Sequence, residues 1–144
     1  MRYVGDRMVA EDVMQEGFIT LFTRLDSYKG EGSFEGWARR IFTTTSLMYL
    51  RKKDALKMSD ELEMVKGMKT ETTSQIQDIG YKELMDLIMS LPTGFRTVFN
   101  MYVIEGYSHK EIAEILDITE TTSRTQLSRA RLWLQSRIKN REDV

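Results

Sequence analysis

Few side chains in this 144-residue chain could do covalent chemistry. It has no cysteine, and therefore no thiolate nucleophile. Its single histidine, His109, cannot by itself anchor a zinc centre. Asp12 and Glu16 could be imagined as paired carboxylates. The helical pattern, however, places them on an exposed face without histidine, cysteine or a phosphate-binding glycine loop. Non-covalent recognition is therefore favoured, and we expect no enzyme, no cofactor and no metal site.

Positive charge gathers in two runs although the net charge of the chain is −1. Residues 39–53 contain five basic and no acidic side chains, and residues 124–141 contain six basic and no acidic ones. Between them, residues 54–92 carry four basic and eight acidic side chains. Such basic clusters are typical of phosphate contacts, although they also occur as ordinary solvated helix faces.

The second basic run follows the spacing of a helix-turn-helix. Ser108 and Glu111 form a capping box at the start of the first helix. After a three-residue break, Thr119 would cap the second helix, which in this motif lies in the DNA major groove. The side chains expected to face DNA are Thr121, Thr122, Arg124, Thr125, Ser128, Arg129 and Arg131. The expected buried stripe is Leu127, Ala130, Leu134 and Ile138.

Two amphipathic helices are expected in the N-terminal part, over residues 10–25 and 34–53, with a glycine-containing loop between them. The expected apolar stripe of the first is Met14, Phe18, Leu21, Phe22 and Leu25. Asp12, Gln15 and Glu16 would share a different, exposed face. The expected buried stripe of the second is Phe34, Trp37, Ala38, Ile41, Thr45 and Met48.

The fold class predicted from these patterns is all-α, with two small helical domains. They would span residues 1–53 and 81–144, joined by a flexible acidic linker over residues 54–80. No run approaches the roughly 18 apolar residues of a membrane span, and the polar first residues do not form a signal peptide. We therefore expect a cytoplasmic protein without membrane insertion.

Two stretches carry family motifs. The first is Ala10-Glu11-Asp12-Val13-Met14-Gln15-Glu16-Gly17-Phe18 followed by Gly30-Glu31-Gly32-Ser33-Phe34-Glu35-Gly36-Trp37-Ala38-Arg39-Arg40-Ile41. The second includes Leu91-Pro92, Glu105-Gly106-Tyr107-Ser108 and Leu127-Ser128-Arg129-Ala130-Arg131. They resemble the promoter-melting and C-terminal promoter-binding domains of bacterial RNA polymerase sigma factors of the extracytoplasmic-function (ECF) class. Together they cover most of residues 2–138, in the family's order.

The resemblance implies a protein that binds core RNA polymerase and directs it to promoter DNA. Asp12, Gln15 and Glu16 match positions that bind the clamp helices of the polymerase's largest subunit. The positions matched to minus-ten recognition are Lys29, Gly30, Gly32, Ser33, Trp37, Arg39, Arg40 and Thr44. The second helix of the helix-turn-helix would bind the minus-thirty-five element. An anti-sigma factor is a candidate further partner, and the free protein is expected to be a monomer.

The chain departs from the family pattern at three places. A helix that usually precedes Arg2 is missing, which indicates either a truncated start or weakened polymerase docking. Thr44 stands where many members have asparagine, and Ser123 and Gln126 replace a commoner valine and basic residue, so the promoter sequence cannot be carried over. The alternative function is a stand-alone helix-turn-helix regulator acting as a homodimer, which would leave the N-terminal half unexplained.

Overall fold

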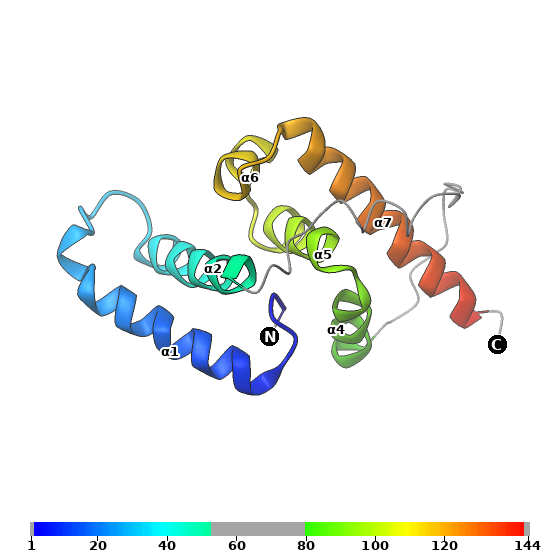
Figure 1. Ribbon diagram of the computed structural model, residues 1–144, viewed down its shortest axis with the longest axis horizontal. Coiled ribbons are helices and arrows are strands. Elements are labelled where there is room, and N and C mark those ends of the chain that lie inside the picture. Colours follow the sequence, from blue (N-terminus) through cyan, green and yellow to red (C-terminus); the bar gives the residue numbers. More distant parts are fainter. Residues whose placement is uncertain (1, 53–79, 143–144) are drawn as a thin grey trace. The chain divides into compact units, whose positions relative to one another are not determined.

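The computed structural model describes residues 2–52 and 80–142, and all regular elements within those ranges are helical. The chain divides into two compact units, one of which includes residues 3–52 and the other residues 80–142. Figure 1 shows α1 and α2 in the first unit and α4 to α7 in the second. The predicted all-α fold with two helical domains is confirmed. The predicted linker lies, apart from Gly80, outside the described residues.

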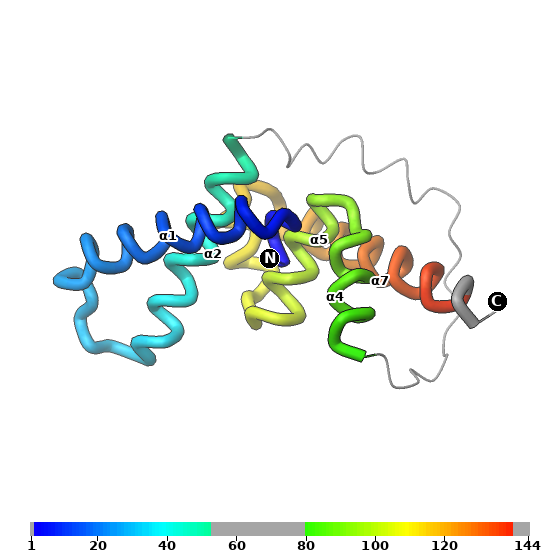
Figure 2. Tube along the Cα trace, turned by 90° about the horizontal axis from the view of Figure 1, so that it is seen from below, coloured from blue at the N-terminus to red at the C-terminus, as the bar shows by residue number. Residues whose placement is uncertain are grey.

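The first unit is a helical hairpin of α1 (Arg7–Thr23) and α2 (Phe34–Lys52), which pack against each other (Figures 1 and 2). Asp6 caps α1, because its carboxylate accepts a hydrogen bond from the Val9 N–H at 2.9 Å. A short 3-10 turn, η1 (Leu25–Ser27), follows α1 and leads into the loop. Both helices therefore begin and end close to where the sequence pattern predicts.

The buried face of α1 differs from the predicted stripe. Val13, Gly17 and Leu21 are the buried residues, at i, i+4 and i+8. Four predicted members stay between 44% and 69% exposed, namely Met14, Phe18, Phe22 and Leu25. The cause is Gly17: without a Cβ it lets the Phe42 ring lie directly against the α1 backbone, so α2 packs on the glycine face. An apolar pattern misses that face because glycine contributes nothing to it.

The buried face of α2 is also displaced from the predicted one. Ile41 is buried as predicted, but its buried partners on α2 are Thr43, Leu47 and Leu50. The predicted Met48 is 65% exposed and Phe34 is 46% exposed. The pairing of the two helices, rather than the apolar pattern of either one alone, selects which face is buried.

The second unit contains four α-helices in its described part: α4 (Tyr81–Ser90), α5 (Thr93–Phe99), α6 (His109–Leu116) and α7 (Glu120–Glu142). A π-helical turn, η3 (Asn100–Ile104), continues α5. As predicted, the chain breaks at Leu91-Pro92 between α4 and α5. The core joins the α4–α5 connection and α5 to α7 through Leu91, Phe95, Ala130 and Trp133.

α6 and α7 form the predicted helix-turn-helix. The capping box is present, with the Ser108 N–H donating to the Glu111 carboxylate at 2.8 Å. Asp117 ends α6 in the left-handed region, at φ 56°, a conformation that aspartate tolerates better than most residues. The Thr119 hydroxyl then accepts a hydrogen bond from the Thr122 N–H at 3.0 Å and caps α7. Local capping chemistry thus sets the angle at which α7 leaves the turn.

Candidate nucleic-acid and partner-binding surfaces

One face of α7 is polar and exposed along four turns. Its exposed side chains follow the spacing i, i+3, i+7, i+10 and i+14; they are Thr121, Arg124, Ser128, Arg131 and Gln135. The predicted residues Thr122, Thr125 and Arg129 are half-buried and lie beside this face. Gln135 was not predicted, although the same spacing continued by one more step would have indicated it. The face combines two arginines with hydroxyl and amide groups, which suits contact with phosphates and base edges.

Arg129 differs from the other two arginines of the motif. Its Nη1 atom is buried and makes no hydrogen bond to any described residue, whereas Arg124 and Arg131 are exposed. A buried donor of this kind is costly unless a partner reaches it. The Arg129 side chain is therefore less accessible to DNA than the sequence pattern predicts.

The inner face of α7 carries two buried polar residues, Ser123 and Gln126, which are 0% and 1% exposed. Ser123 lies 2.8 Å from the Nδ1 of His109, the first residue of α6. The Tyr102 ring stacks on the His109 ring with centroids 4.4 Å apart. The departures from the family pattern at residues 123 and 126 are thus interior positions, where they affect helix packing rather than direct contact with bases.

The pKa of His109 is lowered below its ordinary value. Burial is the main cause; the positive charge of Arg124 lowers the pKa further, Glu120 acts in the opposite direction, and Arg131 lowers it again. The neutral ring can accept at Nδ1 the hydrogen bond that the Ser123 hydroxyl donates. This polar pair therefore joins α6 to α7 in its uncharged form.

The loop between α1 and α2 owes its shape to two glycines and a tyrosine. Gly30 and Gly32 adopt φ values of 73° and 77°, which side chains other than glycine rarely adopt. The Tyr28 hydroxyl donates a hydrogen bond to the Gly32 carbonyl at 2.8 Å. The loop residues Lys29, Gly30, Gly32 and Ser33 are all exposed, and the Ser33 hydroxyl accepts a hydrogen bond from the Gly36 N–H at 3.3 Å. The tip of the loop is thereby presented to solvent in a defined shape.

An aromatic cluster supports this loop. The rings of Tyr28, Phe34 and Trp37 lie with centroids 5.3 to 5.6 Å apart. Phe34 is 46% exposed, and Tyr28 and Trp37 are half-buried, so ring faces and edges remain open to solvent. Partly exposed aromatic rings beside basic side chains suit stacking with unpaired bases.

The predicted residues of α2 that follow the loop do not all share one face. Trp37, Arg40 and Thr44 lie three and four residues apart and therefore along one side of α2. Arg39 points elsewhere and pairs with Glu35, one turn earlier. Arg39, Arg40 and Thr44 are exposed, and the Thr44 hydroxyl donates to the Arg40 carbonyl at 2.8 Å.

The third predicted surface lies on α1. Asp12, Gln15 and Glu16 are all exposed, as the sequence indicated. Large apolar side chains lie among them that the sequence reasoning had not assigned to this surface: Met8, Ile19 and Phe22 are 77%, 67% and 69% exposed. The spacing of residues 8, 12, 15, 19 and 22 is the heptad spacing of a helix–helix contact and could have identified them.

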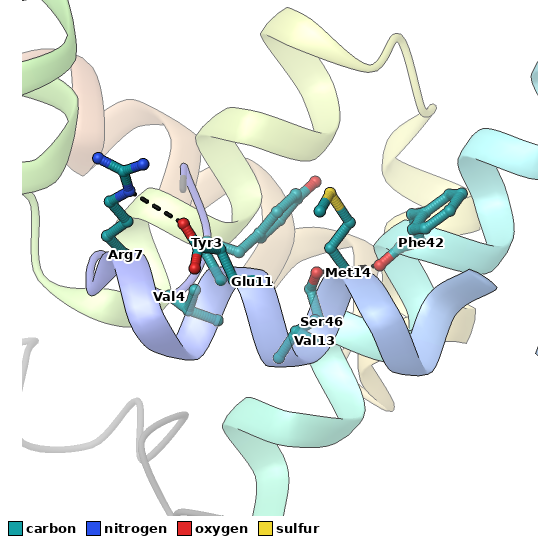
Figure 3. A pocket seen from close by; sticks show the side chains of 9 residues that line it. Tyr3, Val4, Arg7, Glu11, Val13, Met14, Phe42 and Ser46 are labelled. Atoms are coloured by element: carbon teal, nitrogen blue, oxygen red, sulfur yellow. Dashed lines mark hydrogen bonds and ion pairs between the residues drawn. The ribbon is translucent and has the colours of Figure 1, made fainter. Parts of the chain in front are cut away.

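A cavity of about 380 Å³ lies at the start of the hairpin (Figure 3). It is lined by Tyr3, Val4, Arg7, Ala10, Glu11, Val13, Met14, Phe42 and Ser46. Arg7 donates to Glu11 at 2.9 Å, the contact dashed in Figure 3. None of the predicted site residues lines this cavity.

The described ranges contain no group of three or more acidic, histidine or cysteine side chains that could hold a metal ion. In residues 2–52 and 80–142, the helices are too short or too polar to cross a membrane.

Comparison with known proteins places both units in one family. The model of Sigma-70 region 2 matches residues 1–56, and the model of Sigma-70 region 4 matches residues 81–134. The ECF RNA polymerase sigma-E factor of Haemophilus influenzae is 28% identical, over 95% of this chain and 78% of its own length. The corresponding factor of Escherichia coli K12 is 29% identical, over 95% of this chain and 77% of its own length.

A solved structure shares the fold. The sigma factor RpoE of Bartonella quintana, in its complex with the anti-sigma factor NepR, superposes with a TM-score of 0.64 at 20% identity. The match covers 96% of this chain and 86% of that one.

The protein has two helical units, one of them with a helix-turn-helix, and they match two regions of one family. These features define a transcription initiation factor that works with RNA polymerase. The chain belongs to the sigma-70 family of RNA polymerase sigma factors, in its ECF class. It directs promoter-specific initiation of transcription. A stand-alone homodimeric regulator is not favoured, because the region 2 match accounts for the N-terminal half that such a regulator leaves unexplained.

Proposed function

We propose that the two units contact the promoter at separate elements, residues 81–144 at minus-thirty-five and residues 1–53 at minus-ten. The observation that carries this proposal is the exposed face of α7, which starts directly after the capped three-residue turn of the motif. Arg124, Thr125 and Ser128 would contact base edges there, and Thr122 and Arg131 phosphates. Thr121 and Arg129 complete the proposed set.

At minus-ten, the proposed contacts are the loop and the side of α2 that follows it. A base flipped from the duplex costs a few kcal/mol of lost stacking and pairing, which contacts in a pocket must offset. The loop offers backbone groups at Gly30 and Gly32, while Trp37 supplies a ring for stacking. The remaining proposed contacts are Lys29, Ser33, Arg39, Arg40 and Thr44.

Docking to core polymerase is assigned to the exposed acidic and amide face of α1. Asp12, Gln15 and Glu16 would make the polar contacts, and the exposed apolar residues among them would be covered in the complex. The protein would act in the bacterial cytoplasm as a monomer until polymerase binds it, and it would catalyse no covalent step. Because a structural relative was crystallised with an anti-sigma factor, such a regulator is a proposed further partner here.

Transcription in vitro with purified core polymerase tests the proposal. Wild-type protein should give promoter-specific transcripts, and Arg124→Ala should weaken binding at minus-thirty-five by about 1–3 kcal/mol if it contacts a base. Asp12→Ala combined with Glu16→Ala should weaken binding to core polymerase while leaving duplex binding unchanged. The matched control is Glu83→Gln on α4, which removes an exposed charge outside all three surfaces. Unchanged core affinity in the double variant would remove α1 from the proposal.

A further inference from the structure

The exposed side of α7 carries an acidic side chain that DNA binding alone does not explain. Glu120 is the first residue of α7, and its Oε2 accepts a hydrogen bond from the Arg124 Nη2 at 2.8 Å. The side chains of Glu120 and Arg124 remain 44% and 59% exposed, so both are available at the surface. We propose that Glu120 is a specificity-determining residue, which orients Arg124 toward a base and disfavours binding to other DNA. This inference rests on the proposed role of α7.

The charge of Glu120 opposes DNA binding of every sequence. A carboxylate near the phosphate backbone repels it, and this repulsion does not depend on the bases. Without Glu120, the flexible Arg124 could turn toward the nearest phosphate, a contact that carries no sequence information. Glu120 therefore lowers affinity for all DNA while it restricts the directions in which Arg124 can donate.

The geometry of the pair leaves Arg124 able to recognise a base. A guanidinium has five N–H donors in one plane, and Glu120 takes up a hydrogen bond from Nη2 alone among the Arg124 nitrogens. The other donors can still form two parallel hydrogen bonds, the arrangement that distinguishes guanine in the major groove. Holding the side chain in that direction before DNA arrives lowers the entropy lost in the specific contact.

The backbone beneath Glu120 is itself fixed. Thr119 precedes it and caps α7 through the Thr122 N–H, and the two threonine hydroxyls lie 2.8 Å apart. A negative charge at this helix start is also favourable for the helix dipole. Glu120 is thus anchored at the end of α7 that approaches the bases in this motif.

The test uses full-length protein bound to core polymerase and a promoter template. The template has a constant minus-ten element and either the minus-thirty-five sequence that wild type selects from a randomised pool, or a scrambled one. Glu120→Gln should bind the scrambled template about fivefold more tightly, the effect of one unit charge at contact distance in water. On the selected template this gain should be offset by the loss of the orientation that Glu120 gives Arg124, so affinity should change less than twofold and discrimination should fall about fivefold. Selection with this variant should also relax the preference at one base pair.

Glu114→Gln is the matched control, because it removes an exposed acidic charge from α6, outside the groove-facing side of α7. It should leave the discrimination ratio unchanged. A role limited to helix stability predicts that Glu120→Gln weakens binding to both templates equally, and that result, or an unchanged ratio, overturns the inference. If Arg124→Ala and Arg131→Ala leave binding to the selected template unaltered, the proposed role of α7 fails instead.

Discussion

The residues proposed to touch duplex DNA lie on α7, the helix that carries the buried Ala130 and Trp133, whereas the loop proposed to bind minus-ten is exposed. The loop keeps its shape through the left-handed Gly30 and Gly32 and the hydrogen bond from Tyr28. A duplex has a regular groove, which a rigid helix can match. A flipped base must be held in a pocket, which a loop of defined shape can form. The comparison predicts that core substitutions affect the first surface and backbone substitutions the second.

The largest effect is expected for Phe95→Ala in the core beneath α7. Phe95 is 0% exposed, so the cavity left by its ring should cost about 3–5 kcal/mol in the free energy of unfolding of the second unit. Binding at minus-thirty-five should be lost with it. Urea unfolding followed by Trp133 fluorescence, in a Trp37→Phe background, measures the change. Leu84→Ala, at a 45% exposed position, should cost less than about 0.5 kcal/mol and serves as the control.

Gly17→Ala should give the next largest effect, confined to the first unit. A Cβ at residue 17 would collide with the Phe42 ring, and overpacking of this kind costs about 1–3 kcal/mol. Trp37 fluorescence in a Trp133→Phe background reports the unfolding. Gly36→Ala is the matched control, since the nearest atom to its added Cβ lies 3.8 Å away. Equal stability of the two variants would show that α1 and α2 do not depend on close approach at Gly17.

Gly32→Ala tests the backbone conformation of the loop without creating a steric clash. No atom lies within 4 Å of the added Cβ, so the cost comes from the φ of 77°, about 1–2 kcal/mol. Strand opening at minus-ten, measured by permanganate reactivity of unpaired thymines, should fall, while binding to minus-thirty-five duplex should not change. Gly80→Ala, at a φ of −60° with open space around it, should alter neither. Undiminished opening in Gly32→Ala would remove the loop from minus-ten recognition.

The smallest effect is expected from pH acting on His109. Its pKa is lowered in the folded protein, so the unfolded chain takes up a proton first as the pH falls. The stability of the second unit should therefore be fully present above about pH 6.5 and decrease as the pH drops through the lowered folded value. His109→Gln should remove this pH dependence, because no other histidine exists in the chain. Urea midpoints of wild type and His109→Gln at pH 7.5 and 5.5 test this prediction. An equal change in midpoint between the two pH values in both proteins would contradict it.

The features that the sequence predicted are those encoded by neighbouring residues. The Ser108–Glu111 capping box, the break at Pro92 and the cap at Thr119 each depend on residues at most three positions apart. Each also sets the direction of a helix, so the helix-turn-helix and most of the exposed face of α7 could be predicted with it.

The features that the sequence did not predict depend on contacts across the fold. Phe42 selects the glycine face of α1 from a distant position, which leaves the expected stripe around Phe18 exposed. The hydrogen bond between His109 and Ser123 joins residues 14 positions apart on two different helices. The apolar periodicity of a single helix cannot predict such a contact. Helix periodicity indicates that a face is apolar but not which partner, if any, covers it.

The hydrogen bond between His109 and Ser123 has a consequence for engineered promoter selectivity. A recognition helix transplanted from a relative with valine at the equivalent of Ser123 would leave the half-buried His109 without its partner. Chimaeras of this factor should therefore exchange α6 and α7 together, so that residues 109 and 123 come from the same parent protein. Exchanges limited to the outward positions of α7 avoid that incompatibility and offer the simpler route to a factor with a redirected promoter preference.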